Sequence, residues 1–509
     1  MENTPVCVMC PIHVSVDEVD HTPQPIMDIK SKIRLYSVLL GLSVTFVIMA
    51  SNKKGVLLPT SPYHFSSLVS LRPYTFNLSS VKDYAHIKLV VGSITSKVEF
   101  RSSRQLPELK ALVNSEPNMF SAIPRKFLPG VKNPCWYEEY TGNITSDPYR
   151  TNLYALYSSR FRTLFQHLRN TFRERLFHRD GKPYRMRCLP YFYIIGQPKC
   201  GTTDLYDQLS LHQDVKFSTF KEPHWWTRRR FGIKPLSEGF HDRYPVEDYL
   251  DLFDQAAYQI QGKLTTNASG SPSQPNIIIG EASASTMWDN NAWVYFYDNT
   301  TEGEPPFLVL DFVHALQPNA RFIIMLRDPV ERLYSDYLYF GIANKSAEDF
   351  HEKVSESLQL FEGCLTEYTM RSCVYNTTVN NAMPVRLYVG LYIVYLMDWM
   401  TVFSREQILV LRLEDHASNR KYTMHKVFDF LNLGLPTKEI ESKITRSPAS
   451  NTRRTSDKNL GPMLPITEEI LRDFYMPFNE KLAKVLQNDS FLWENSKLCT
   501  THLPFTSVK

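Results

Sequence analysis

The sequence has little net charge, few cysteines and only one long uncharged apolar run near its N-terminus. Its formal charge is +4 over 509 residues, so we expect no nucleic-acid partner from bulk electrostatics. Cys7 and Cys10 form a CxxC pair, but no second pair follows at zinc spacing, which favours inert or lipidated thiols. The length and the 43% hydrophobic content suit one large domain with an extension, or two domains.

The apolar run covers residues 35–50 and has basic residues on both sides. Its sixteen residues are fewer than the roughly 20 of a usual membrane span, and a cleaved signal peptide is the alternative. More than thirty residues precede the run, which is long for a signal peptide. We therefore predict a cytosolic tail over 1–34, a signal-anchor helix over 35–50, a lumenal extension over 51–150 and a large domain over 151–509.

Possible glycosylation sites support this orientation, because every Asn-x-Ser/Thr sequence follows the apolar run. The asparagines are Asn77, Asn143, Asn267, Asn299, Asn344, Asn376 and Asn488. Cys364 and Cys373 are close enough in sequence to form a disulfide in an oxidising lumen. The sequence leaves the other pairings open, and we expect Cys200 to stay free.

A phosphate-binding loop is the central feature of the sequence. A buried strand is predicted over residues 191–195, Gly196 and Gly201 frame a loop, and a helix follows from Thr202. Backbone N–H groups and a helix N-terminus in this order form an anion site, although a tight turn is the simpler alternative. The lysine lies inside the loop, whereas an ATP-binding loop has it after the second glycine. The candidate anion-binding residues are Lys199, Cys200, Gly201, Thr202 and Thr203.

A candidate acid–base pair follows in the segment Lys221-Glu222-Pro223-His224-Trp225-Trp226. An extended segment would direct Glu222 and His224 to the same side. Trp225 and Trp226 would wall a site or stack on a sugar, the alternative being a buried aromatic cluster. Arg228 and Arg229 come next, either as contacts to an anionic substrate or as a solvated loop.

A second anion site is predicted after the strand over residues 321–327. Asp328 and Pro329 suit the start of a helix, where Arg327 and Ser335 would converge on one anion. Capping and salt bridging are the alternative for these side chains. Two anion sites at neighbouring strand ends suit a ligand that carries two anionic groups.

Together these motifs resemble those of the Golgi carbohydrate sulfotransferases, over about residues 191–493. The resemblance implies an α/β, P-loop-like sulfotransferase fold, with a mostly parallel sheet flanked by helices. It implies 3′-phosphoadenosine 5′-phosphosulfate (PAPS) as the sulfate donor. We expect no metal, because the sequence has no cluster of metal ligands and a sulfuryl group carries less charge than a phosphoryl group. Glu222 would be the catalytic base, His224 its neighbour and Lys199 the cation at the leaving phosphate. Arg453 and Arg454 match a basic loop that closes over the nucleotide, although the usual Lys-Gly-Arg is missing.

Two segments indicate the acceptor, LHQDVKFSTFKEPHWWTRRRFG and GEASASTMWDN. Both resemble segments of enzymes that sulfate C6 of N-acetylgalactosamine 4-sulfate. The implied partners are chondroitin and dermatan sulfate chains and the Golgi membrane. Glu281 and Ser283 are candidate substrate contacts, but Ala282 replaces the lysine of the heparan 3-O-sulfotransferases, which argues against heparan. The alternatives are another acceptor position, a P-loop kinase or ATPase, and a non-catalytic glycan-binding protein. The oligomeric state stays open, a homodimer included.

Further helices are predicted away from these motifs, among them the following three. Residues 152–178 have an apolar side and a basic side, and residues 466–486 form a helix that we expect to break near Pro477. Residues 387–403 are strongly apolar but contain Asp398, which favours a buried helix over a second membrane span.

Overall fold

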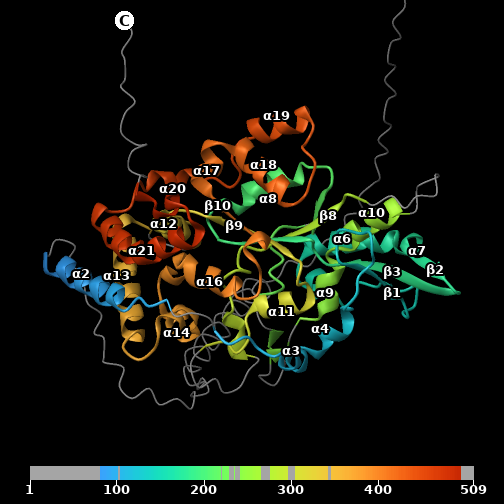
Figure 1. The fold of residues 1–509 in the computed structure, drawn as a ribbon, viewed down its shortest axis with the longest axis horizontal. Coiled ribbons are helices and arrows are strands. Elements are labelled where there is room, and N and C mark those ends of the chain that lie inside the picture. The colour runs from blue at the N-terminus through green and yellow to red at the C-terminus, as the bar shows by residue number, and fades with distance from the viewer. Residues whose placement is uncertain are drawn as a thin grey trace, which may run out of the picture. The chain divides into compact units, whose positions relative to one another are not determined.

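A five-stranded parallel sheet lies at the centre of the computed structural model (Figure 1). The strand order is β10-β9-β4-β8-β5, and every neighbouring pair is parallel, as predicted. The strands are β4 (Phe192–Gly196), β5 (Val215–Phe217), β8 (Ile278–Ala282), β9 (Arg321–Leu326) and β10 (Ile408–Arg412).

The structure describes residues 81–100, 104–218, 220–227, 234–235, 241–242, 244–264, 275–295, 304–341 and 345–494, all within the unit Phe76–Lys509. The predicted anchor over 35–50 lies outside these ranges, and no helix within them is long and apolar enough to span a membrane. The other predicted residues outside the described ranges are Asn77, Arg228, Arg229, Asn267, Asn299 and Asn344. Asn143 and Asn488 are exposed, and half-buried Asn376 caps a helix through its side chain.

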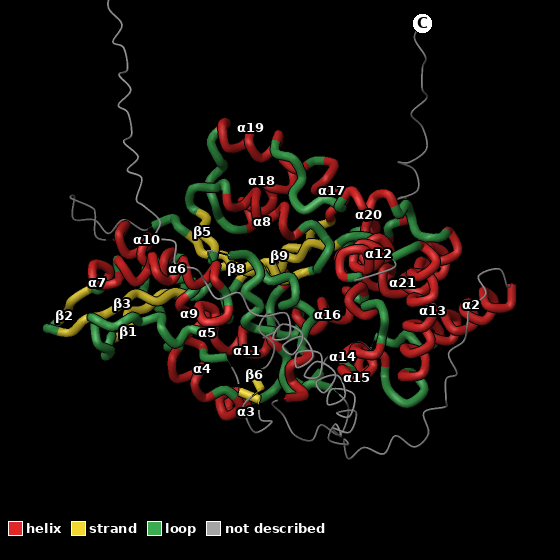
Figure 2. Tube along the Cα trace, turned by 180° about the vertical axis from the view of Figure 1, so that it is seen from behind, coloured by secondary structure: helices red, strands yellow, loops and turns green. Residues whose placement is uncertain are grey.

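Helices cover both faces of the sheet (Figure 2). On β4, Phe192 and Ile194 join a core with side chains of α8 (Thr202–Ser210) and α18 (Arg420–Phe430). The alternate residues Tyr193 and Ile195 join a larger core with α11 (Val309–Leu316) and α16 (Tyr392–Trp399). Because side chains alternate along a strand, burial of both faces requires an apolar residue at nearly every position.

The strand order changes direction at β4. The chain passes from β4 to β5 and β8 on one side, and then to β9 and β10 on the other. Ligands of such sheets bind outside the carboxyl ends of the strands, where the order reverses. The predicted phosphate loop follows β4, and Arg327 follows β9, so both motifs lie at this point.

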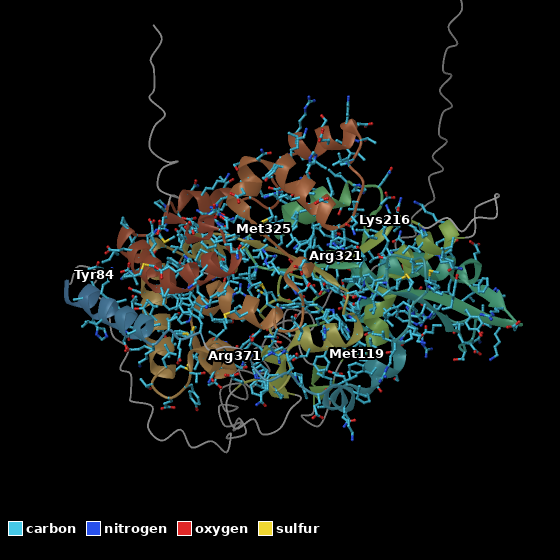
Figure 3. All side chains as sticks on the ribbon, in the orientation of Figure 1. Tyr84, Met119, Lys216, Arg321, Met325 and Arg371 are labelled. Carbon is cyan, nitrogen blue, oxygen red and sulfur yellow. A yellow bond between two sulfur atoms is a disulfide. The ribbon has the colours of Figure 1, made fainter. Side chains whose placement is uncertain are left out.

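Described residues before 151 pack on the rest of the unit. β1 (Cys135–Glu139) pairs antiparallel with β3 (Lys182–Cys188), and the register places Cys135 opposite Cys188, with which it forms a disulfide. α2 (Val81–Ser96) contacts α21 (Pro465–Leu486), where Tyr84 donates to Glu469 over 2.9 Å (Figure 3).

Two helix predictions are corrected and one is confirmed. Residues 152–178 do not form one helix, because the backbone of Ser158 is extended, and three short helices and a strand result: α5 (Leu153–Tyr157), α6 (Ser159–Asn170), α7 (Phe172–Arg175) and β2 (Phe177–Arg179). Helix α21 continues through Pro477, because the flanking Phe474 and Phe478 are buried and outweigh one lost hydrogen bond. Residues 387–399 form η2 (Leu387–Gly390) and α16 and are mostly buried, which confirms a helix within the core.

The predicted disulfide between Cys364 and Cys373 is present, and Cys200 is free. The remaining elements are α3 (Leu109–Ser115), α4 (Pro117–Ala122), β6 (Lys234–Pro235), β7 (His241–Asp242), α9 (Val246–Asp251), α10 (Asp254–Leu264), η1 (Asn291–Tyr295), α12 (Pro329–Phe340), α13 (Ala347–Cys364), α14 (Met370–Tyr375), α15 (Thr377–Ala382), η3 (Arg405–Gln407), α17 (Leu413–Ser418), α19 (Lys438–Arg446), α20 (Thr455–Asn459) and η4 (Asp489–Leu492).

Candidate active site

The loop between β4 and α8 has a backbone that only certain residues tolerate. Gly201 has a φ of 85°, and a Cβ atom there would lie 2.5 Å from Cδ1 of Leu413, so both the backbone conformation and the nearby side chain favour glycine. Lys199 also has a positive φ, of 65°, which is unusual for a residue with a side chain. The loop thus directs Lys199 into a cavity while α8 begins at Thr202, with its free N–H groups toward the same region.

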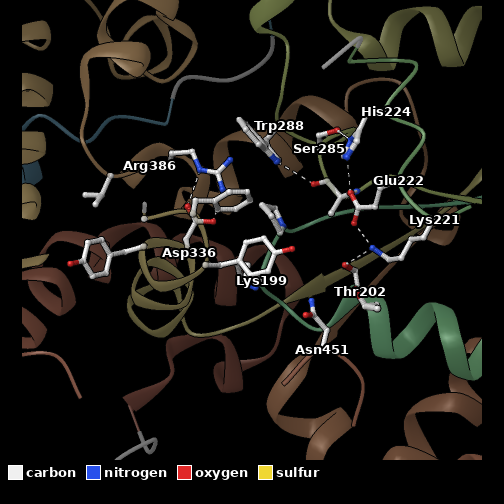
Figure 4. Close-up of a pocket in the computed structure, with 18 of the residues that line it drawn as sticks. Lys199, Thr202, Lys221, Glu222, His224, Ser285, Trp288, Asp336, Arg386 and Asn451 are labelled. Atoms are coloured by element: carbon white, nitrogen blue, oxygen red, sulfur yellow. Dashed lines mark hydrogen bonds and ion pairs between the residues drawn. The ribbon is translucent and has the colours of Figure 1, made fainter. Parts of the chain in front are cut away.

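The cavity has a volume of about 810 Å³ and is formed by three walls (Figure 4). The loop wall consists of Pro198, Lys199, Thr202, Thr203 and Asn451. The carboxylate wall consists of Lys221, Glu222, His224, Ala284, Ser285 and Trp288. The helical wall consists of Asp336, Tyr337, Tyr339, Phe340, Gly341, Lys353, Pro384, Val385 and Arg386. A space of this size suits a ligand larger than one sugar ring.

Glu222 and His224 meet in the carboxylate wall, as predicted, but their segment is not extended. Their φ angles are 64° and 54°, and Nε2 of His224 lies 3.0 Å from Oε2 of Glu222. The N–H of Glu222 donates to the carbonyl of Ala282 over 2.8 Å, which fixes the segment to the carboxyl end of β8. Nδ1 of His224 lies 2.7 Å from Oγ of Ser285. Strained backbones of this kind are found where surrounding contacts hold functional residues in place.

Two nearby carboxyl groups have opposite protonation tendencies. Burial opposes ionisation of Glu222, but the hydrogen bond from His224 and the Lys221 charge outweigh it and lower its pKa to about 2. Burial raises the pKa of Glu281 to about 8, despite a hydrogen bond from Ser283. At neutral pH Glu222 is therefore an ionised acceptor of protons, whereas Glu281 is protonated.

Lys199 lies in the loop wall, with Nζ 3.6 Å from the centre of the Tyr339 ring. Burial and the charges of Arg327 and Arg454 lower the pKa of Lys199 to about 8, although Asp336 opposes the shift. Arg454 approaches the same ring, with its guanidinium carbon 5.3 Å from the centre. Tyr339 therefore lies next to both the loop lysine and the basic segment over residues 450–454.

The predicted second anion site is also assembled around one side chain. Nη2 of Arg327 lies 3.0 Å from Oε2 of Glu331, and Nη2 of Arg453 lies 3.3 Å from the same oxygen. Asp328 caps α12 by accepting from the N–H of Val330, as its position before Pro329 predicted. Ser335 lies two turns into this helix and is largely buried. The structure thus brings Arg327 and Arg453 together from segments far apart in sequence.

The basic segment is also tied to α8. Asp204 accepts a hydrogen bond from the N–H of Ser450 over 2.9 Å, and its other oxygen lies 2.7 Å from Nε2 of His416. Nε of Arg420 is 3.4 Å from Asp204. This buried cluster holds the backbone next to Asn451, which lines the cavity.

Other predicted residues lie outside the cavity lining. Trp225 and Trp226 are buried, and their rings pack on Tyr249, as in the alternative of an aromatic cluster. Glu281 and Ser283 lie behind the lining, where the hydroxyl of Ser283 accepts from the N–H of His224 over 2.9 Å. Cys200 is buried, and burial raises the pKa of its thiol to about 12, which disfavours a nucleophilic thiolate.

Several lining residues were not predicted. Lys221 adjoins Glu222 in the sequence, and that adjacency was a usable signal. Trp288 lies in the segment GEASASTMWDN but was not singled out. Asp336 and Arg386 gave no signal, because only the fold brings their segments together. No group of three or more His, Cys, Asp or Glu side chains with metal-site geometry is found among the described residues.

Comparisons with known proteins agree with the motifs. A family model described as a sulfotransferase domain matches residues 303–486. Carbohydrate sulfotransferase 15 of Mus musculus is 60% identical over 482 residues, covering 90% of this chain and 86% of that protein. The Homo sapiens protein of the same name is 59% identical with the same coverage. Heparan sulfate glucosamine 3-O-sulfotransferase 3A1 of Mus musculus is 25% identical, over 60% of this chain and 65% of that protein. The chain therefore belongs to the carbohydrate sulfotransferases and is a sulfotransferase enzyme.

Proposed function

We propose that the protein transfers the sulfuryl group of PAPS to the C6 hydroxyl of N-acetylgalactosamine 4-sulfate in chondroitin and dermatan sulfate. The observation that carries this proposal is the convergence of Lys199, Glu222 and His224 on one cavity at the switch point of the sheet. The sequence resemblance in the segments around Glu222 and Glu281 supports this acceptor.

The described residues fit a donor that carries two anionic groups. Lys199 and the N-terminus of α8 provide one cationic region, with Thr202 and Thr203 as hydroxyl donors. Arg327 and Arg453 provide the other, and Ser335, the serine of the predicted motif, follows on α12. Glu331 neutralises one of the two positive charges in this second region. The remaining positive charge still favours the binding of an anion. Asn451 and Arg454 belong to the segment that joins the two regions.

Glu222 is the group that we expect to activate the acceptor. Its carboxylate is ionised at neutral pH and would accept the proton of the attacking hydroxyl, a contribution of about 10²–10⁴-fold. His224 orients the carboxylate from one side, and Ser285 in turn holds the imidazole. When bound, PAPS supplies the sulfuryl group, and the bond from sulfur to the 5′-phosphate oxygen breaks as the bond to the acceptor oxygen forms.

Lys199 is the group that we expect to stabilise the negative charge released on the phosphate side. Its ammonium is held by the positive-φ loop and by the Tyr339 ring, so little reorganisation is needed during the reaction. Lys221 contacts both the candidate base and the phosphate loop, because its Nζ pairs with Glu222 and also lies 3.4 Å from Oγ1 of Thr202.

We place this activity in the lumen of the Golgi, with the chain anchored as a single-pass type II membrane protein. The support is the apolar run over 35–50 and the position of every glycosylation sequence after it. The disulfide between Cys135 and Cys188 suits an oxidising compartment.

The test is a transfer assay with radiolabelled PAPS and four acceptors: chondroitin 4-sulfate, unsulfated chondroitin, dermatan sulfate and heparan sulfate. Disaccharide analysis then locates the new sulfate. We expect label at C6 of 4-sulfated N-acetylgalactosamine. Label only on heparan or unsulfated chondroitin would contradict the acceptor. Binding of adenosine 3′,5′-bisphosphate without any transfer would favour a non-catalytic glycan-binding protein.

A further inference from the structure

The helical wall of the cavity contains an arginine that the proposed chemistry does not use. Nε of Arg386 donates to Oδ2 of Asp336 over 2.8 Å, and Nη2 donates to the other carboxylate oxygen. In Figure 4 this pair and the Glu222–His224 pair lie at opposite sides of the cavity, with Lys199 between them. A group that contacts Arg386 would therefore be bound across the cavity from the candidate base.

The surroundings of Arg386 hold its guanidinium in one orientation. Its carbonyl accepts from Nη2 of the buried Arg332 over 2.9 Å, so both its backbone and its side chain are fixed to α12. The guanidinium carbon lies 4.6 Å from the centre of the Phe340 ring and 5.5 Å from that of Trp288. Trp288 is itself fixed, because Nε1 donates to the carbonyl of Ala284 over 3.2 Å. Such preorganisation reduces the entropy lost when a ligand binds.

The charge balance of this corner favours an anion. Asp336 is buried and carries one negative charge, but Arg332 lies 3.7 Å behind it and Arg386 lies in front. Two guanidinium groups against one carboxylate leave one positive charge. The bonds to Asp336 use Nε and Nη2, so the hydrogens of Nη1 take no part in this pair. Arginine presents such hydrogens in a rigid plane that suits sulfate and carboxylate groups.

The other cations of the cavity lining have different roles or partners. Lys199 belongs to the donor side, and Lys221 pairs with Glu222. Lys353 lies 2.7 Å from Asp349 one helical turn away. Arg386 is thus the lining residue best arranged to bind an anionic group of the acceptor, with aromatic rings beside it that suit a sugar face.

We infer that Arg386, positioned by Asp336 and flanked by Trp288 and Phe340, binds an oxyanion of the acceptor glycan. This inference rests on the proposed function, and it names the subsite that selects an acceptor already carrying negative charge. The oxyanion is either the existing 4-sulfate of N-acetylgalactosamine or the carboxylate of the neighbouring uronic acid. Arg386 is a binding residue here, and Asp336 and Arg332 are positioning residues.

The test is the binding of three hexasaccharides to the full-length protein with saturating adenosine 3′,5′-bisphosphate, measured by calorimetry. The hexasaccharides are chondroitin 4-sulfate, unsulfated chondroitin and carboxyl-reduced chondroitin 4-sulfate. Arg386→Gln is compared with wild type and with Arg125→Gln, an exposed arginine outside the cavity lining. Loss of a charged hydrogen bond corresponds to a Kd increase of about 10- to 100-fold.

A Kd increase confined to the two 4-sulfated hexasaccharides would support the inference and identify the sulfate. An increase confined to the two carboxylate-containing hexasaccharides would support it and identify the uronic acid. Equal increases for all three, or none, would overturn it. Arg386→Lys retains a cation but lacks the planar guanidinium group. It should weaken the binding of the same hexasaccharides to a smaller extent. This variant tests the inference even if Arg386→Gln fails to fold.

The inference and the proposed function fail in different ways. Wild-type protein that binds these hexasaccharides through Arg386 but transfers no sulfate to them would contradict only the proposed function. Wild-type protein that sulfates C6, together with an Arg386→Gln variant that binds all three hexasaccharides normally, would contradict only the inference.

Discussion

Lys221 and Glu222 are adjacent in sequence and form an ion pair in the cavity, where Lys221 Nζ also lies 3.4 Å from Oγ1 of Thr202. The candidate base is therefore in contact with a cation that also contacts the start of α8. This arrangement links the acidity of Glu222 to the donor side of the cavity.

Replacement of Lys221 by glutamine should raise the pKa of Glu222. The Lys221 charge is one of the causes that lower this pKa to about 2, and Glu222 acts as a base only when deprotonated. Activity is lost as the pH falls through this pKa, so the acid limb of kcat/KM should move to higher pH in Lys221→Gln.

The control for this experiment is Lys353→Gln, since Lys353 lines the same cavity but pairs with Asp349. Its acid limb should match that of the wild type. An unchanged limb in Lys221→Gln would show that Lys221 does not set the acidity of the base.

The titration of Lys199 should produce a basic limb near pH 8 in the pH profile of kcat/KM. Its pKa is lowered to about 8, and its ammonium form is the one that stabilises the leaving phosphate. Because a lysine loses its charge as the pH rises through its pKa, kcat/KM should fall above about pH 8. Lys199→Arg, which keeps its charge, should show lower activity but no limb in this range.

A second group titrates in the same range, since the pKa of Glu281 is about 8. Glu281→Gln removes this titration and should retain the basic limb of the wild type. If the basic limb disappeared in Glu281→Gln and persisted in Lys199→Arg, the limb would belong to Glu281. That result would contradict our account.

Arg327 and Arg453 should bind the nucleotide together. Each arginine contacts Glu331, and an anion at this position would replace that carboxylate. Arg327→Ala and Arg453→Ala should each weaken the binding of adenosine 3′,5′-bisphosphate by about 10- to 100-fold, as expected for charged hydrogen bonds. Glu331→Gln should bind at least as tightly as wild type, and weaker binding by that variant would show that Glu331 supports the site.

The disulfides should differ in their contribution to stability. Cys135 and Cys188 are 53 residues apart, whereas Cys364 and Cys373 are 9 apart. The chain-entropy model gives about 4 kcal/mol for the longer loop and roughly 2.6 kcal/mol for the shorter one. Thermal unfolding of Cys135→Ser/Cys188→Ser should therefore show the larger decrease in Tm compared with Cys364→Ser/Cys373→Ser, and the reverse order would contradict this estimate.

The sequence predicted those parts of the site that are continuous in the chain. The loop from Gly196 to Gly201 was predictable because a buried strand, a glycine frame and a helix follow one another directly. The start of α12 was predictable because Asp328 and Pro329 suit a cap and a first turn. The parallel sheet was predicted through the resemblance to the carbohydrate sulfotransferases, and the apolar residues on both faces of β4 and β9 agree with it.

The remaining features depend on the fold. Asp336 and Arg386 are fifty residues apart and pair only because α12 and the segment before η2 pack together. Residue types alone could not place Trp225 and Trp226, since an aromatic residue suits a core as well as a sugar site. The pairing of Cys135 with Cys188 requires the register of β1 and β3, which residue types alone do not determine.

The most direct test of the central claim is the rate of sulfate transfer by Glu222→Gln under single-turnover conditions. This variant keeps the size of the side chain but removes the group that accepts the proton of the acceptor. We predict a rate at least about 100-fold below wild type, with binding of adenosine 3′,5′-bisphosphate unchanged and a cooperative unfolding transition that shows a folded variant. A rate within a few-fold of wild type, from a variant that folds and binds the nucleotide normally, would contradict the assignment of Glu222 as the base.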